Sequence, residues 1–234
     1  MSAPRADGIL FDKDGTLFGF HATWAAWARK VISELSGGDP ALERALAAAT
    51  RFDLEAGAFH PDSPVIAGTN RQAAELVAAV LPDAEVAAIE TYLMYSAAEA
   101  PLAPAVPLAP LLDGLAARGL ALGVMTNDTE FGARAHLRAA AVEDRFAFIA
   151  GFDSGHGAKP APDPLLAFAH AAGLAPARVV MVGDSTHDLV AGRAAGMQCV
   201  AVLTGMAEAA ELAPHADAVL PDIGHLPRWL DGTG

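Results

Sequence analysis

Two aspartates stand at the end of a short apolar run near the amino terminus, in the segment Ile9-Leu10-Phe11-Asp12-Lys13-Asp14-Gly15-Thr16-Leu17. The apolar run predicts a strand that is buried on both faces, and Gly15 lets the backbone turn sharply after it. In an open α/β sheet, ligands bind in the crevice outside the carboxyl ends of the strands. Asp12 and Asp14 are therefore candidates for chemistry, although Asp and Gly are also ordinary turn residues.

Further polar residues follow later apolar runs, namely Thr126, Asn127, Lys159, Asp184 and Asp188. Because the carboxyl ends of parallel strands share one edge of a sheet, these side chains are expected to lie close to Asp12 and Asp14. At an effective dielectric of about 20, two carboxylates ~4 Å apart repel each other by roughly 4 kcal/mol. A divalent cation with oxygen ligands removes that conflict, and Mg²⁺ is the usual choice where phosphate oxygens complete the shell. A lysine beside such a site can act as a point charge for a phosphoryl oxygen.

The elements that must position these residues follow from hydrophobic periodicity. Beyond residue 107 the pattern predicts helices over 108–118, 129–140, 163–172 and 186–196, and strands over 120–125, 146–150, 179–182, 199–203 and 218–220. Strands that alternate with helices indicate a parallel, doubly wound sheet. The first strand belongs to the same sheet, so the chain is expected to be an α/β protein with a Rossmann-like core.

Residues 21–98 have a different pattern and are expected to be all-helical. Apolar spacing predicts helices over 21–35, 40–50, 69–81 and from Pro82 to about residue 98, whereas 52–68 shows no clean period. Four closely spaced prolines between 101 and 110 then indicate a stiff linker. We therefore predict a core made of 1–17 and 104–234, with a helical cap (18–103) inserted after the first strand.

Composition narrows the class of protein. The net charge of −13 argues against a nucleic-acid-binding surface. Cys199 is the single cysteine, which excludes an intramolecular disulfide and favours a reducing compartment. Residues 1–8 contain no apolar leader core, and no apolar run is long enough to span a membrane. These features predict a cytoplasmic protein.

Four ordered segments resemble the motifs of the haloacid dehalogenase superfamily of phosphohydrolases. They are Asp12-Lys13-Asp14-Gly15-Thr16-Leu17, Thr126-Asn127, Lys159-Pro160 and Gly183-Asp184-Ser185-Thr186-His187-Asp188. The resemblance covers the whole chain, and the position of the helical cap makes it most similar to the phosphoglycolate-phosphatase-like branch. It implies a Mg²⁺-dependent phosphatase for a small phosphorylated metabolite, with a monomer or a homodimer as the expected state.

The resemblance also implies roles for the two aspartates of the first motif. Asp12 would be the nucleophile that forms an aspartyl-phosphate, and its second oxygen would bind Mg²⁺. Asp14 would protonate the leaving alcohol and then activate water, while its main-chain carbonyl binds the metal. Carboxylates are established covalent nucleophiles, and phosphoryl transfer depends mainly on positioning and charge neutralisation.

The remaining motifs carry supporting roles in the same family. Thr126 would hydrogen-bond the transferring phosphoryl group with help from the Asn127 amide, and Lys159 would bridge phosphate and nucleophile. Asp184 would be a metal ligand, and Asp188 would hold a metal-bound water or orient the lysine.

The sequence leaves several alternatives open. A sugar-phosphate mutase shares all four motifs, whereas a dehalogenase would not need Asp14 or the full acidic set. Gly183-Asp184-Ser185 also resembles the nucleophile block of one serine esterase family, although a glycine is missing where a nucleophile elbow requires it. A non-catalytic binding protein on the same fold is a further alternative.

Substrate choice is expected to come from the cap, acting as a mobile lid. His21 begins the first cap helix and is predicted to face the site. Arg71 is a weaker candidate for binding a substrate carboxylate, because a cation in the first turn of a helix opposes the helix dipole. Trp24 and Trp27 are expected to pack inside the cap instead of contacting substrate.

Overall fold

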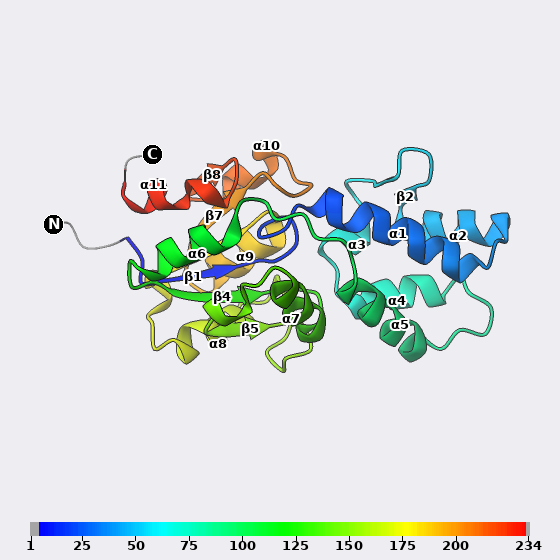
Figure 1. Cartoon of the computed structure of the whole chain (residues 1–234), viewed down its shortest axis with the longest axis horizontal. Helices are drawn as coiled ribbons and strands as arrows, with labels where there is room; N and C mark the ends of the chain where they lie inside the picture. The colour runs from blue at the N-terminus through cyan, green and yellow to red at the C-terminus, as the bar shows by residue number, and fades with distance from the viewer. Residues whose placement is uncertain (1–4, 233–234) are drawn as a thin grey trace.

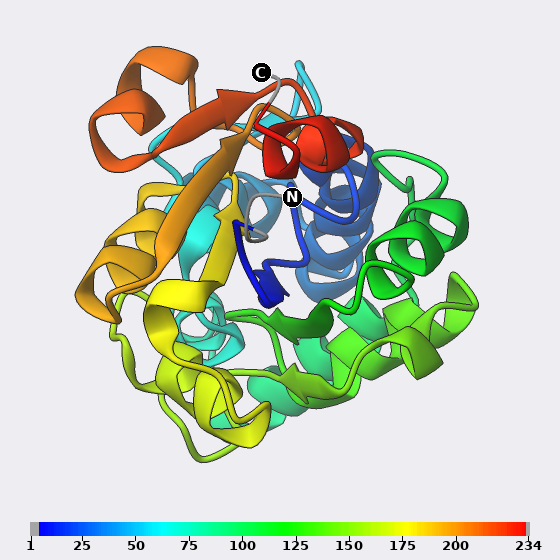
Figure 2. The same cartoon turned by 90° about the vertical axis from the view of Figure 1, so that its left-hand side faces the viewer.

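A parallel sheet forms the centre of the molecule. The computed structural model describes residues 5–232 of the chain, and within them six parallel strands are arranged in the order β5-β4-β1-β6-β7-β8. Figure 2 shows the strands in this order, with helices on both sides. The strands are β1 (Gly8–Phe11), β4 (Ala121–Met125), β5 (Phe148–Ala150), β6 (Val179–Gly183), β7 (Gln198–Val202) and β8 (Ala218–Leu220).

Alternate residues of the strands pack into two different hydrophobic cores, one on each face of the sheet. Ile9 and Phe11 belong to the cluster that packs under α6 (Leu108–Ala116), α7 (Glu130–Ala139) and α11 (Leu226–Leu230). Leu10 points to the opposite face, where α8 (Asp163–Ala171) and α9 (Thr186–Ala194) cover the sheet. This period of two follows from the pleat of a strand, and it confirms the predicted doubly wound α/β fold.

Strand β1 lies at the point where the chain reverses its direction across the sheet. Its Phe11 is in register with Val124 of β4 on one side and with Val182 of β6 on the other. The main-chain N–H of Asp12 continues the ladder by donating to the Val182 carbonyl at 2.8 Å. Ligand sites of open α/β sheets lie at such a switch point, so the carboxyl end of β1 is where a site is expected.

A second body of helices follows β1 in the chain and lies beside the sheet (Figure 1). Its helices are α1 (Phe20–Ser36), α2 (Pro40–Thr50), α3 (Pro64–Ala67), α4 (Asn70–Ala78) and α5 (Val86–Ala98). They enclose an apolar cluster of their own, which includes Trp24, Trp27 and Leu93. The predicted starts of α2 and α4 are confirmed, since Asp39 accepts from the N–H of Ala41 and a Thr69–Gln72 capping box begins α4.

The inserted segment is helical apart from one short hairpin, which the sequence did not predict. Strands β2 (Phe52–Asp53) and β3 (Ala58–Phe59) pair antiparallel, and the rings of Phe52 and Phe59 meet edge to face 5.1 Å apart. The Asp53 carboxylate accepts from two N–H groups in the turn, and Gly57 adopts a φ of 67°. Strands of two residues are too short to show an alternation of apolar and polar residues in the sequence.

The helix expected to begin at Pro82 begins later, at Val86. Asp83 has a φ of 54°, in the left-handed region, so the residues between α4 and α5 form a turn. Among the helices described within 5–232, none is long and apolar enough to cross a membrane.

The two connections between the sheet and the inserted helices run side by side. The N–H of Gly19 donates to the Ala103 carbonyl at 2.8 Å, and the N–H of Ala105 donates to the Leu17 carbonyl at 2.9 Å. These antiparallel hydrogen bonds tie together chain segments about 85 residues apart, so the inserted helices are attached to the sheet through one narrow double strand.

Candidate active site

A buried lysine joins a carboxylate at the carboxyl end of β1 to a carboxylate in the first turn of α9. The Lys159 ammonium lies 2.5 Å from Asp12 Oδ1 and 2.6 Å from Asp188 Oδ1, and it donates to the Met125 carbonyl at 2.9 Å. All three side chains are more than nine-tenths buried. The pKa of Lys159 is raised, because these carboxylates outweigh the burial that would lower it. The lysine is therefore charged and fixed beside Asp12.

A third carboxylate completes an acidic cluster. Oxygens of Asp12, Asp184 and Asp188 all lie within 4.8 Å of one another. Burial raises the pKa of Asp12 to about 7, even though Lys159 acts to lower it. Burial and the nearby Asp12 carboxylate likewise raise the pKa of Asp184 well above its usual value. The single positive charge of Lys159 thus does not neutralise the three carboxylates.

The surroundings of Asp184 fit a cluster that holds a hard cation. A Cβ at Gly15 or Gly205 would overlap the Asp184 carboxylate, so both glycines leave space for it. Thr16 Oγ1 donates to Asp184 Oδ1 at 3.3 Å, which orients the group. Buried carboxylate oxygens grouped in this way match the ligand preference of Mg²⁺. The Asp14 side chain is not in this cluster, and a metal contact through its main-chain carbonyl stays a prediction.

Thr126 and Asn127 lie at the end of β4, as the sequence predicted. Asn127 donates to the carbonyls of Lys159 and Ala67, both at 2.9 Å, and its Oδ1 accepts from the Lys159 N–H at 2.9 Å. Its amide thus fixes the lysine loop and contacts the inserted segment. Thr126 Oγ1 accepts from the Asp128 N–H at 3.1 Å, and its own hydrogen is free to be donated. Whether either residue binds a phosphoryl group stays a prediction.

A second buried lysine, for which the sequence made no prediction, holds Asp14. Lys13 is fully buried, and its ammonium lies 2.7 Å from Asp14 Oδ2 and 3.1 Å from Asp128 Oδ2. Burial alone would lower the pKa of Lys13, but the two carboxylates outweigh it and the pKa is raised. The position of Lys13 between Asp12 and Asp14 could have predicted this pairing, because a lysine is buried only where carboxylates neutralise it.

The Lys13 network reaches the inserted helices through His136. His136 Nδ1 lies 2.9 Å from the Lys13 ammonium and Nε2 lies 2.8 Å from the Ala97 carbonyl at the end of α5. An ammonium can only donate, so Nδ1 accepts and Nε2 carries the hydrogen given to Ala97. Burial and Lys13 lower the pKa of His136, which agrees with a neutral ring. Asp14 is thereby linked to α5 through Lys13 and His136.

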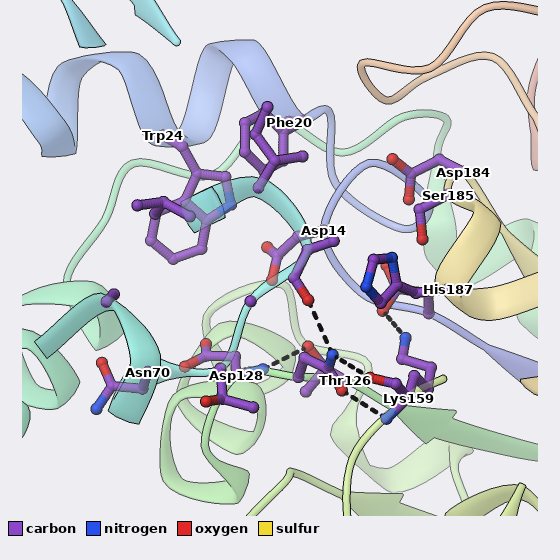
Figure 3. Close-up of a pocket in the computed structure, with 18 of the residues that line it drawn as sticks. Asp14, Phe20, Trp24, Asn70, Thr126, Asp128, Lys159, Asp184, Ser185 and His187 are labelled. Atoms are coloured by element: carbon purple, nitrogen blue, oxygen red, sulfur yellow. Dashed lines mark hydrogen bonds and ion pairs between the residues drawn. The ribbon is translucent and has the colours of Figure 1, made fainter. Parts of the chain in front are cut away.

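A pocket that is partly open to solvent lies between the strand ends and the inserted helices (Figure 3). The strand-end residues that line it are Asp12, Asp14, Thr126, Asn127, Lys159, Asp184 and Asp188. The structure therefore brings together the predicted catalytic and metal-binding residues of all four motifs.

The predicted cap residues are placed differently. His21 is exposed and is not among the residues that line the pocket, because α1 turns Phe20 and Trp24 toward it instead. Trp24 and Trp27 pack in the apolar cluster of the inserted helices, as expected, and both also line the pocket, so whether either contacts substrate stays a prediction. Arg71 lies outside the lining and is paired with Glu75 and Glu90.

Ser185 shows no esterase arrangement. Its hydroxyl donates to Asp188 Oδ2 at 2.7 Å, and its N–H donates to the same oxygen at 3.0 Å. These contacts make it the N-cap of α9. Within residues 5–232 no histidine is hydrogen-bonded to this hydroxyl, so the activating base of a serine nucleophile is missing there.

Curated relatives of this chain include phosphoglycolate phosphatases. The one from Rhodospirillum rubrum is 38% identical over 120 residues, which cover 51% of this chain and 50% of the relative. The one from Neisseria meningitidis is 40% identical over 112 residues, which cover 47% of each. The chain thus spans about half the length of the curated relatives it matches.

Solved structures show the same fold over nearly the whole chain. A protein described as a predicted phosphoglycolate phosphatase from Haemophilus somnus gives a TM-score of 0.74 at 20% identity, covering 97% of this chain and 99% of that one. CbbY from Rhodobacter sphaeroides, solved with phosphate, gives 0.72 at 22% identity, covering 94% and 96%. The family model for haloacid dehalogenase-like hydrolases matches residues 6–196. With its sheet, its four strand-end motifs and this match, the chain belongs to the haloacid dehalogenase-like hydrolase family.

Proposed function

We propose that this protein is a Mg²⁺-dependent phosphatase that hydrolyses a small phosphate monoester through an aspartyl-phosphate. The observation that carries the proposal is the position of Asp12, which lines the pocket, contacts Lys159 and lies within reach of two further carboxylates, Asp184 and Asp188, that are suited to a cation. The similarity to phosphoglycolate phosphatases supports the same reaction. Phosphoglycolate, for which those relatives are named, is the reference substrate.

In the proposed reaction an Asp12 oxygen attacks phosphorus while the bond from phosphorus to the leaving oxygen breaks. Asp14 gives its proton to that oxygen and then takes one from the water that hydrolyses the acyl phosphate. Asp14 suits this task, since it lines the pocket, its Oδ2 is held by Lys13, and its buried Oδ1 has no hydrogen-bond partner among the described residues. Lys159 balances charge beside Asp12.

When bound, Mg²⁺ would neutralise phosphoryl charge, with Asp12, Asp184 and Asp188 as the residues that hold it or its water. Saturating Mg²⁺ at about 100 times its Kd is expected to raise the free energy of unfolding by ~2.7 kcal/mol. Asp184→Asn should remove this shift, because it deletes a ligand. Thermal unfolding with and without Mg²⁺ measures it.

Asp113→Asn is the matched control for this metal prediction, since Asp113 is exposed and pairs only with Arg145 among the described contacts. Phosphate release should also stop with excess chelator and return when Mg²⁺ is added. Full turnover by protein shown to be metal-free would contradict the metal-dependent reaction.

Asp14→Asn is expected to slow turnover by about 10²–10⁴-fold, the usual contribution of a general acid–base group. An amide can neither give the proton to the leaving alcohol nor take one from water. Release of inorganic phosphate under saturating substrate measures the effect. Phosphate release also separates hydrolysis from the mutase alternative, in which the phosphoryl group stays on the product sugar. An unchanged kcat in Asp14→Asn would assign the proton transfers to another group.

We also propose that the cap is the segment 18–103 and that it closes over a core made of 1–17 and 104–234. The paired connections near Leu17 and Ala103 support these limits, because the chain enters and leaves the inserted segment there. The Asn127–Ala67 and His136–Ala97 hydrogen bonds hold the inserted helices against the sheet. Breaking these bonds would open the pocket to solvent.

A further inference from the structure

The half of the pocket that faces away from the sheet is built from apolar and aromatic side chains. This wall contains Phe20, Trp24, Trp27, Phe59, Val65 and Ala97. In Figure 3, Phe20 and Trp24 extend from α1 toward the strand-end carboxylates. If the phosphoryl group lies at Asp12, as the proposed function requires, the alcohol part of the substrate must lie against this wall.

The basic side chains of the pocket come from its strand-end side, where His187 lies in the first turn of α9 and Lys159 lies beside Asp12. Among the described residues that line the pocket, Lys159 is the only lysine or arginine, and it is bound to Asp12 and Asp188. Lys13 lies beneath the Trp24 ring, 5.3 Å from its centroid, but it is fully buried and held by Asp14 and Asp128. A second anionic group on the substrate would meet carboxylates and apolar surface, and an unpaired buried charge is costly.

The start of α4 is a further feature of the wall that attracts anions. Gly68, Thr69 and Asn70 line the pocket there. The capping box already uses the N–H groups of Thr69 and Gln72, which donate to the Gln72 and Thr69 side chains. The Asn70 amide donates to the Glu90 carbonyl at 2.9 Å. The chain itself therefore already uses three of the donors at this end of α4, which are the N–H groups of Thr69 and Gln72 and the side-chain amide of Asn70.

The Trp24 indole offers a hydrogen-bond donor that the chain does not use. Trp24 Nε1 is buried and has no partner among the described residues, whereas Trp27 Nε1 donates to Ser96 Oγ at 3.1 Å. Buried donors are normally paired. Of the two tryptophans in the wall, Trp24 alone therefore keeps a donor for an oxygen of a bound phosphate ester.

We propose that the substrate is the phosphate ester of an uncharged alcohol with an apolar ring, which packs on Phe20, Trp24 and Phe59. The inference rests on the proposed function and names its substrate class. It separates this protein from the relatives named for phosphoglycolate, whose substrate carries a carboxylate in place of the ring. One methylene in a hydrophobic pocket changes kcat/KM by about 10–200-fold, so a whole ring is a strong determinant.

Benzyl phosphate and phosphoglycolate are the test pair. Both release a primary alcohol, which carries a phenyl ring in the first and a carboxylate in the second. We expect kcat/KM for benzyl phosphate to exceed that for phosphoglycolate by at least about tenfold. Val65→Lys adds a cation to the wall and should shift the ratio toward phosphoglycolate, whereas the uncharged Val65→Met should preserve the preference. A preference of the unaltered protein for phosphoglycolate would overturn the inference and leave the phosphatase proposal standing.

Binding of the ring is measured without turnover in Asp12→Asn protein. Benzyl phosphate should change its tryptophan fluorescence, and adding Trp24→Phe should reduce the change. Phosphoglycolate should produce a smaller change at the same concentration. A fluorescence change with benzyl phosphate, combined with hydrolysis of neither ester by the unaltered protein, would support the apolar site and refute the phosphatase. No change with benzyl phosphate would refute the apolar site.

Discussion

Replacing Asp12 with asparagine is expected to abolish turnover, with kcat falling by about 10⁵-fold or more. The side-chain amide cannot attack phosphorus, and in this site no other carboxylate is placed to substitute for it. Asp14 is turned toward Lys13, Asp188 is held by Lys159 and Ser185, and Asp184 is held by Thr16. Phosphate release and trapping of a phospho-enzyme from labelled substrate measure the two consequences.

Asp113→Asn again serves as the control for Asp12→Asn, because it makes the same chemical change at an exposed carboxylate away from the pocket. It should retain normal turnover and the trapped phospho-enzyme. If Asp12→Asn kept near-normal turnover, water would attack phosphorus directly and the covalent route would be wrong.

Lys13→Met is expected to lower the free energy of unfolding by about 3–5 kcal/mol, the usual cost of removing one partner from a buried ion pair. The substitution leaves the largely buried carboxylates of Asp14 and Asp128 facing each other without a cation, and it removes the donor to His136. Because Asp14 loses the group that orients it, kcat should fall as well. Urea unfolding and phosphate release measure the two effects.

Lys30→Met is a matched control, since Lys30 is half exposed and lies 4.0 Å from its partner Glu34. An exposed ion pair on a helix contributes about 0.5 kcal/mol or less, so this variant should unfold close to the unaltered protein. Equal unfolding midpoints for Lys13→Met and Lys30→Met would show that the buried network adds nothing to stability.

Local patterns in the chain were enough to predict the sheet, its helices and the residues at its carboxyl edge. Strands such as β6 are short apolar runs that end in Gly183 and Asp184, and the alternation of strands and helices permits one common arrangement. Parallel strands bring their ends together whatever the loops do, so Asp12, Thr126 and Asp184 had to converge. Helix starts at Asp39 and Thr69 were predictable because the capping side chain is adjacent in sequence.

The cap side of the pocket was not predictable from those patterns. Which face of α1 meets the sheet depends on how the whole inserted segment packs, and this packing turns Phe20 and Trp24 toward the pocket and His21 toward solvent. The β2–β3 hairpin pairs too few residues to leave a period. Arg71 was a candidate for binding a substrate carboxylate because its partner Glu90, nineteen residues away, could not be predicted from the sequence.

By itself, then, the sequence determined the fold class, the order of the strands' polar ends and the acidic chemistry at the edge of the sheet, because each depends on neighbours in the chain. Only the tertiary structure decided the partners of Lys13, the link from Asp14 through His136 to α5, and the uncharged wall of the pocket. These contacts join residues up to about 120 positions apart. They exist only because two separately packed bodies meet, and no local pattern records how their surfaces fit.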